Sequence, residues 1–326
     1  MIDPLITMRV VHFASTVMVA GATLFVCFIA EPAFQAVGEP PWRVVRPFRG
    51  RLFGLLSASL VLAVVSGAGW LLLLAAKIGN QSLSEAITEG TAWVLLTQTR
   101  FGLDWQLRLL LAVLLAGSLL LERRTPSRWL DLFAALAGSI FIAALAWAGH
   151  GAATSGIAGD VHLGADIFHL IAAGAWLGGL IPFVLLVRLL RHSDEPGWAT
   201  IACAVVSRFS NLGIIAVGTL LVSGTINAWF LVGGPVNWTG TGYGRLLQLK
   251  IALFVGMICL AAVNRQYLMP HLSADISGYD PERRTRTARK MERNAMLEVT
   301  LGLAVVVVVA MLGITQPATE AHVHVH

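Results

Sequence analysis

The stretch GADIFHLIAAGAWLGGLIPFVLLV at residues 164–187 decides the fold. It is apolar throughout except for a few positions, and Asp166 and His169 are its only ionisable side chains. A helix of about 20 apolar residues is long enough to cross the roughly 30 Å hydrocarbon core of a bilayer. We therefore expect this stretch to span a membrane.

Seven more stretches have the same character. The predicted spans are residues 5–29, 51–76, 104–121, 129–148, 164–187, 209–231, 246–264 and 295–314. The strands of a membrane barrel would instead show alternation in segments of about 10 residues, so these spans are predicted to be helices. The first span has no basic start and no small-residue cleavage site, and we interpret it as a retained span rather than a signal peptide.

The composition of the 326 residues agrees with a polytopic all-α membrane protein. Apolar residues make up 56% and charged residues 13%, whereas soluble domains carry about 25% charged residues. The mean hydropathy is +0.75. These values exclude a soluble enzyme and a nucleic-acid-binding protein, and three scattered cysteines are too few for a disulfide-linked secreted domain.

Basic residues predict the orientation. The loops after the first, third, fifth and seventh spans hold seventeen of the 23 lysines and arginines, whereas residues 149–165 hold none. Because Lys and Arg concentrate in cytoplasmic loops, both termini are expected outside. The cluster at 283–293 is then an inner anchor that contacts anionic lipid, rather than a site for nucleic acid.

The chain also contains an internal duplication. His12 precedes Gly21 by nine residues, as His169 precedes Gly178, and the offset between these pairs is 157. Further landmarks recur in the same order: Arg51 and Ser66 match Arg208 and Ser223, and Thr99-x-Phe101-Gly102 matches Thr241-x-Tyr243-Gly244, now at an offset of 142.

The duplication predicts two four-helix repeats that run in the same direction, related by an axis along the membrane normal. The first repeat is residues 1–150, the second is 151–316, and an external His-rich tail covers 317–326. The change of offset predicts an outer-surface insertion at about 77–98, which contains a capping-box pattern, Ser82-x-x-Glu85.

His12 and His169 occupy matching positions within the first and fifth spans. Ionisable groups at membrane depth usually face the bundle interior and serve function. Imidazole binds copper, zinc, iron or nickel, and thioether sulfur suits Cu(I). The pair therefore predicts a metal site, with one shared ion or two similar ones, and Met8, four residues before His12, lies on the same helix face. The alternative is that both histidines only hydrogen-bond across helices.

Other residues on the outer side extend the set of candidate metal ligands. They are His150, His162, Asp166 and the tail residues His322, His324 and His326. Arg9 and Asp166 are equivalent positions of opposite charge, and a salt bridge between them is expected. Arg108 and Lys250 are expected to extend to the lipid headgroups. The alternative is that they repel cations and hold the anionic edge of a cofactor.

Several motifs together resemble the CopD/PcoD family of bacterial inner-membrane copper-resistance proteins. They are His169-x6-Trp176-x-Gly178-Gly179, Arg208-Phe209-Ser210, Ser223-Gly224-x2-Asn227-x-Trp229, Tyr243-Gly244-x5-Lys250, Phe101-Gly102-x2-Trp105-x2-Arg108 and Gly149-His150-Gly151. The resemblance implies an eight-helix protein of the bacterial plasma membrane that moves copper toward the cytoplasm. It also implies His169 and, by repeat symmetry, His12 as copper ligands, and a periplasmic copper-binding partner of the CopC type.

We therefore expect a copper transporter rather than an enzyme, with copper collected at the outer face and held by His12 and His169. The alternative is a haem-b redox protein in which the same histidines are axial ligands. A third possibility is an accessory membrane protein with structural histidines. Besides the copper-binding partner, membrane lipids are expected to contact the protein, and a homo-oligomer is compatible with the sequence.

Overall fold

The computed structural model describes residues 3–36, 42–149, 156–192, 198–234, 236–272 and 281–319. Within these ranges the chain is helical and contains no strand. The elements of the first half are α1 (Pro4–Phe25), η1 (Val26–Ala30), α2 (Glu31–Gln35), α3 (Trp42–Gly79), α4 (Leu83–Thr88), α5 (Thr91–Gln98), α6 (Arg100–Arg124), α7 (Arg128–Ala143) and η2 (Ala144–Ala148). Those of the second half are α8 (Gly156–Ala173), η4 (Gly174–Gly178), α9 (Gly179–Arg191), α10 (Trp198–Val232), α11 (Val236–Gly240), α12 (Gly242–Val263), η5 (Asn264–Leu268) and α14 (Pro281–Leu312).

Among the described residues, eight helical segments are long and apolar enough to cross a membrane, which confirms the predicted number of spans. They are Pro4–Gln35, Trp42–Gly79, Arg100–Arg124, Arg128–Ala148, Gly156–Arg191, Thr200–Val232, Gly242–Leu272 and Thr285–Leu312. Most are longer than predicted. Hydropathy detects only the part of a helix inside the hydrocarbon, whereas these helices continue into polar sequence at their ends.

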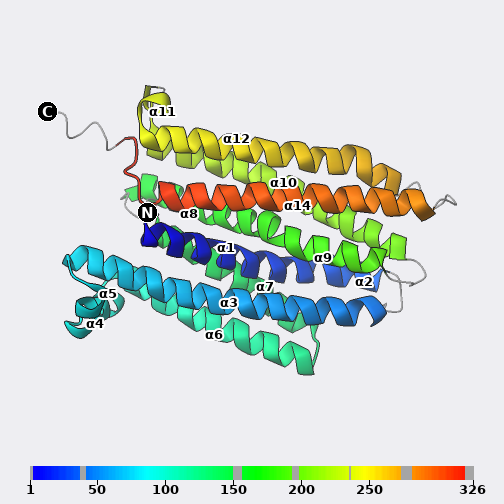
Figure 1. The fold of residues 1–326 in the computed structure, drawn as a ribbon, viewed down its shortest axis with the longest axis horizontal. Coiled ribbons are helices and arrows are strands. Elements are labelled where there is room, and N and C mark those ends of the chain that lie inside the picture. Colours follow the sequence, from blue (N-terminus) through cyan, green and yellow to red (C-terminus); the bar gives the residue numbers. More distant parts are fainter. Residues whose placement is uncertain are drawn as a thin grey trace.

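The helices lie side by side along one long axis, and α1 runs through the middle of the bundle (Figure 1). It packs against α3, η4, α7, α14 and α9. The apolar window of the α1 segment is 72% buried, whereas the windows of the α10 and α12 segments are 17% and 6% buried. Consequently α1 forms the core, and α10 and α12 present most of their surface to lipid.

Local sequence explains several helix starts. The side chain of Asp3 accepts from the backbone N–H of Leu5, and Pro4 occupies the first helical position, where its missing N–H costs nothing. Thr99 and Thr241 cap α6 and α12 in the same way, each accepting from the backbone N–H three residues on, at 3.0 Å. The predicted equivalence of these two threonines is therefore visible in their hydrogen bonds.

The predicted outer insertion contains α4 and α5, and its capping box is confirmed. The backbone N–H of Ser82 donates to Glu85 at 2.8 Å, and that of Glu85 donates to the Ser82 hydroxyl at 3.2 Å. Hydrogen bonds to the Glu85 carboxylate from the backbone N–H and the side chain of Ser82 lower the pKa of this carboxyl. Because the folded-state pKa is lowered, the stability from this cap is present at neutral pH and is lost as the pH falls through that pKa.

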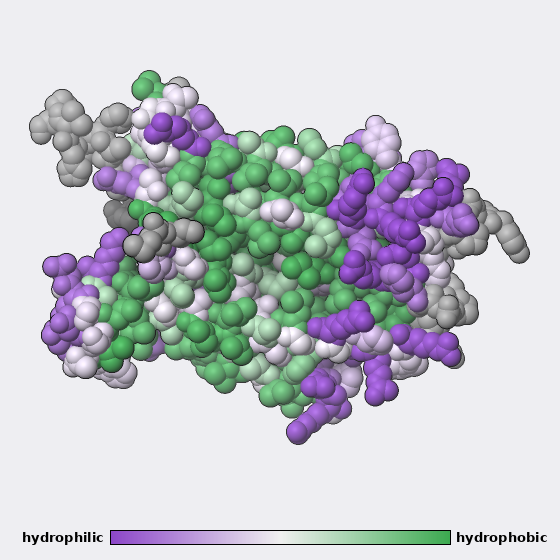
Figure 2. All heavy atoms as spheres, in the orientation of Figure 1, coloured by the Kyte–Doolittle hydropathy of each residue, from purple (hydrophilic) through white to green (hydrophobic). Residues whose placement is uncertain are grey.

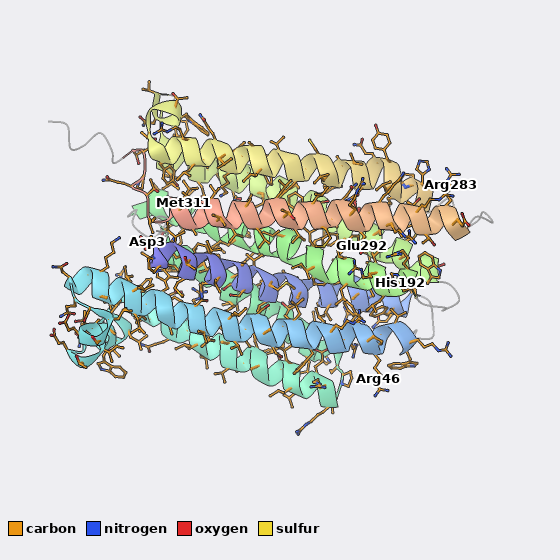
Figure 3. All side chains as sticks on the ribbon, viewed as in Figure 1. Asp3, Arg46, His192, Arg283, Glu292 and Met311 are labelled. Atoms are coloured by element: carbon orange, nitrogen blue, oxygen red, sulfur yellow. The ribbon has the colours of Figure 1, made fainter. Side chains whose placement is uncertain are left out.

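One end of the bundle carries the basic residues, and we call it the basic end. Hydrophilic atoms gather there over the ends of α3, α9 and α14 (Figure 2). Arg46, His192 and Arg283 lie at this end, whereas Asp3 and Met311 lie at the other (Figure 3). The start of α1 and the end of α14 therefore share one end, and the positive-inside rule predicts that the basic end faces the cytoplasm.

The two halves meet where α1 crosses η4. A Cβ added at Gly178 would lie 2.9 Å from Cα of Gly21 and closer still to the Val17 carbonyl oxygen. A Cβ at Gly21 would meet the backbone of Gly174 and Gly178. Small residues at such crossings let two helix backbones approach in a membrane. Gly21 and Gly178 are separated by the repeat offset of 157, so matching positions of the two halves contact each other.

We predict that Gly178→Ala lowers the thermal stability of the detergent-purified protein. The added methyl group meets backbone that cannot move aside without separating α1 from η4, and overpacking of this kind costs about 1–3 kcal/mol. Gly218→Ala in α10 is the matched control, since a Cβ there has open space. Equal melting temperatures for the two variants would contradict the tight crossing.

Candidate functional site

His12 lies inside the first half and is 1% exposed. Its Nδ1 is 2.8 Å from the backbone carbonyl oxygen of Ala63 on α3. A carbonyl oxygen only accepts hydrogen bonds, so Nδ1 carries the proton and donates. The lone pair on Nε2 then faces the guanidinium of Arg108 on α6, whose Nη2 donates to it at 2.5 Å.

Aromatic rings and a second cation enclose this first site. The rings of Trp70 and Trp105 lie 5.7 and 5.0 Å from the His12 ring, centroid to centroid. Arg9 stacks on Trp70 at 4.5 Å, and Arg108 stacks on Trp105 at 4.8 Å. Both arginines are buried, at 7% and 1% exposed, so two guanidiniums flank the histidine.

His169 in α8 forms the matching second site. Its Nδ1 is 3.0 Å from the hydroxyl of Ser223 on α10, and that hydroxyl donates its own proton to the Thr219 carbonyl at 2.6 Å. Nδ1 of His169 therefore donates, and its Nε2 lone pair faces Nζ of Lys250 on α12 at 3.5 Å. As in the first site, the proton is on Nδ1 and a basic side chain faces Nε2.

The backbone beneath the two rings is also alike. Cε1 of His12 lies 3.2 Å from the place of a Cβ on Gly67, and Cε1 of His169 lies 3.4 Å from that of Gly224. Ser66 stands 3.3 Å from Nδ1 of His12, so each histidine meets the serine 54 residues further on. In each half, a histidine packs on a Ser-Gly pair of the next spanning helix, and a basic side chain contacts its Nε2.

The two sites differ in charge. Asp166 occupies in α8 the position that Arg9 occupies in α1, and it accepts a hydrogen bond from Asn227 at 3.2 Å. Asn227 in turn occupies the position of Trp70. The second site therefore contains one carboxylate, one amide and one ammonium group, whereas the first contains two guanidiniums and two indoles.

The remaining candidates are distributed as follows. Met8 packs on α3, with its sulfur 2.9 Å from the place of a Cβ on Gly69, on the side of α1 that also carries His12. His162 is buried and stacks on Phe230 at 4.8 Å and 11°. His150, His322, His324 and His326 lie outside the described residues. Within the described ranges, no group of three or more His, Cys, Asp or Glu side chains is placed to hold a metal ion.

Two sequence-based expectations are wrong. No ion pair joins Arg9 to Asp166 among the described residues, because Arg9 stacks on Trp70 and Asp166 takes its hydrogen bond from Asn227. Arg108 does not extend to the headgroups, since it is buried against His12, and Lys250 is directed at His169. Arg108 and Lys250 recur at an offset of 142, just as Ser66 and Ser223 recur at 157. This recurrence beside the repeated histidines is the signal in the sequence that could have placed both cations near His12 and His169.

Comparison of the sequence with known proteins identifies a family. Residues 1–160 match the model of the copper resistance protein D-like N-terminal domain, and residues 203–312 match that of copper resistance protein D. No solved structure matches the chain significantly.

Three relatives extend this result. Copper resistance protein D of Pseudomonas syringae pv. tomato is 32% identical over 321 residues, which cover 98% of this chain and 99% of the relative. Inner membrane protein YebZ of Escherichia coli K12 is 28% identical over 96% of this chain and 98% of its own length. Copper transport protein CutJ of Bacillus subtilis 168 is 32% identical over 147 residues, 45% of this chain and 24% of that protein. The chain belongs to the copper resistance protein D family.

Proposed function

We propose that this protein moves copper ions across the bacterial inner membrane and that the second site, around His169, is its principal copper-binding site. Family membership supports copper as the substrate. The observation that supports this site is the Nε2 lone pair of His169, which faces Nζ of Lys250, an ammonium group that also interacts with the carboxylate of Asp166.

Charge favours the second site over the first. A copper ion at Nε2 of His12 would lie against the guanidinium of Arg108, and Arg9 adds a second buried positive charge near the histidine. Like charges repel strongly where water is excluded. At His169 the carboxylate of Asp166 offsets the charge of Lys250. Asp166 can also provide an oxygen ligand, so imidazole and carboxylate together offer two donors for a copper ion.

The facing cation supplies a means of release. In the described state Lys250 occupies the side of His169 on which copper would bind, with Nζ 3.5 Å from Nε2. An arriving ion displaces the flexible lysine chain toward Asp166, and the returning ammonium group expels the ion. Arg108 is held more tightly, because it stacks on Trp105 and contacts His12 directly. The first site is therefore a structural counterpart that stays closed.

Delivery and direction complete the proposal. We propose that His150 and the tail histidines His322, His324 and His326, which the sequence predicts to be on the outer side, gather copper supplied by a periplasmic copper-binding protein of the CopC type. Transport runs from the outer side to the cytoplasm. The haem-b alternative gains no support from the comparisons, whose names refer to copper resistance and copper transport.

We predict that His169→Ala and Asp166→Asn weaken copper binding by about 10- to 100-fold and abolish copper uptake by reconstituted vesicles. His12→Ala is the matched control, since it removes the equivalent side chain from the first half. It is expected to lower stability, because Arg108 then stays buried with only the longer hydrogen bond to Thr16, and to retain copper affinity. An equal loss of affinity in folded His12→Ala would contradict the assignment to the second site.

We predict that Lys250→Met strengthens copper binding by about tenfold, equivalent to about 1.4 kcal/mol, and slows copper release. Methionine keeps the length of the side chain and removes the charge that competes for His169. Lys77→Met, on the exposed end of α3, is the control. Weaker copper binding in Lys250→Met would contradict a displacing lysine, as measured by equilibrium titration and stopped-flow release.

Metal content and a visible spectrum separate copper from haem. The protein is purified with a tag free of histidine and a chain that ends at Pro317, so that the tail cannot collect stray metal. We expect copper without a Soret band, because the proposed site is a metal-ion site. Iron with a Soret band would contradict the proposed function.

A further inference from the structure

A further polar group lies in the membrane interior, away from the first and second sites. Glu298 is on α14, about halfway between its first residue Pro281 and its last residue Leu312, and is 2% exposed. Its Oε1 accepts from Nδ2 of Asn264 at 3.0 Å. Asn294, one turn earlier on α14, donates to the carbonyl of the same Asn264 at 2.9 Å. Trp176 also donates a side-chain hydrogen bond to Glu298, so the carboxylate is held by two neutral donors, one amide and one indole.

Every other charged group near α14 is engaged elsewhere or distant. Arg265 of η5 donates to Ser210 at 2.6 Å and to Asn211 at 3.2 Å. Arg188 and Arg191 of α9 pair with Glu292, almost two turns from Glu298 toward the basic end. Three further charged groups on the elements that pack against α14 lie toward its other end, namely Arg9 of α1 and Arg245 and Lys250 of α12.

The contrast between the two buried glutamates of α14 is informative. Glu292 is 6% exposed and has two arginine partners, so its negative charge is compensated. No ion pair to Glu298 occurs among the described residues. Burying a lone carboxylate in hydrocarbon is costly, whereas its protonated form is neutral and easily buried. Glu298 is thus placed to exist in a neutral state.

A cavity of 390 Å³ adjoins the carboxyl group. It lies among α9, α10, the end of α12 and α14, and its wall includes Trp176, Phe209 and Ile258. On α14 its lining extends from Glu298 to Met291, which is toward the basic end. A water molecule occupies about 30 Å³, so the cavity has room for several waters between Glu298 and that end.

We infer that Glu298 is a proton-exchange site, reached from the basic end through this cavity, and that copper movement is accompanied by proton movement at Glu298. A proton from the solution at the basic end is relayed by waters in the cavity to a carboxylate oxygen, each water accepting one proton as it passes another on. In the coupled cycle the proton is released toward the other end of the bundle, so no other reactant is required. The coupling to copper rests on the proposed function, whereas the protonation of Glu298 does not.

Chemical labelling tests the protonation alone. Dicyclohexylcarbodiimide reacts with protonated carboxyl groups in apolar surroundings, and peptide mass spectrometry of the intact, folded protein locates the adduct. We expect labelling of Glu298 that declines as the pH rises, and no labelling of Glu292, the compensated control on the same helix. A Glu298 that stays unlabelled at every pH, or whose labelling does not change with pH, overturns the proton site.

Transport tests the coupling. In vesicles that contain a pH-sensitive dye, we expect copper influx through the wild-type protein to change the internal pH. Glu298→Gln should reduce this change about tenfold, and Glu298→Asp should restore it, because only the latter can exchange a proton. Gln can still accept from Asn264, so the variant is expected to fold.

The outcomes separate the two proposals. Copper affinity of Glu298→Gln should equal that of the wild type, and a loss of affinity would make Glu298 a copper ligand and overturn its role as a proton site. Normal proton movement in Glu298→Gln overturns the coupling. A wild-type protein that moves no copper contradicts the proposed function, while the labelling result still decides whether Glu298 exchanges protons.

Discussion

A polar group inside the hydrocarbon of a membrane has no water to pair with, so its partners must come from the protein itself. This constraint organises the interior of the bundle. His12 donates to a backbone carbonyl and accepts from Arg108, while Arg108 stacks on Trp105. The helices α1, α3 and α6 are therefore joined at one histidine, and α8, α10 and α12 are joined in the same manner at His169.

The close crossing of α1 and η4 has a different basis, because it depends on backbone shape rather than on polarity. Gly21 and Gly178 let the two halves approach at matching positions. The histidines lie nine residues before these glycines and make their hydrogen bonds within their own halves. This arrangement gives two separate sites rather than one shared ion, and their different charges then assign them different roles.

A charge balance that differs between equivalent positions is the simplest way for a duplicated protein to divide its functions. Arg9 in one half and Asp166 in the other give two sites of similar geometry different charges, and in the proposed function only the site with the carboxylate accepts a cation. The same applies along α14, where Glu292 has arginine partners and Glu298 has the neutral partners Asn264 and Trp176. In both cases the neighbours of an ionisable group decide what it can bind.

The sequence by itself determined the eight spans, the capping box at Ser82 and Glu85, the equivalence of His12 with His169, and the family. These features depend on local periodicity and spacing, which a single chain displays directly. The duplication as a division into two repeats stays a prediction, supported by the matching contacts of the two histidines. Several predicted spans are shorter than the helices of the structure, because hydropathy identifies only the part of a helix that lies in the hydrocarbon.

Only the tertiary structure decided which side chains meet. Arg9 and Asp166 are opposite in charge and equivalent in sequence, yet each finds its partner within its own half. Arg108 and Lys250 could extend along their own helices to the surface, or turn inward to a histidine on another helix, and spacing along α6 or α12 does not distinguish the two. That choice depends on how far apart the helices pack and how they rotate, which is a property of the whole bundle.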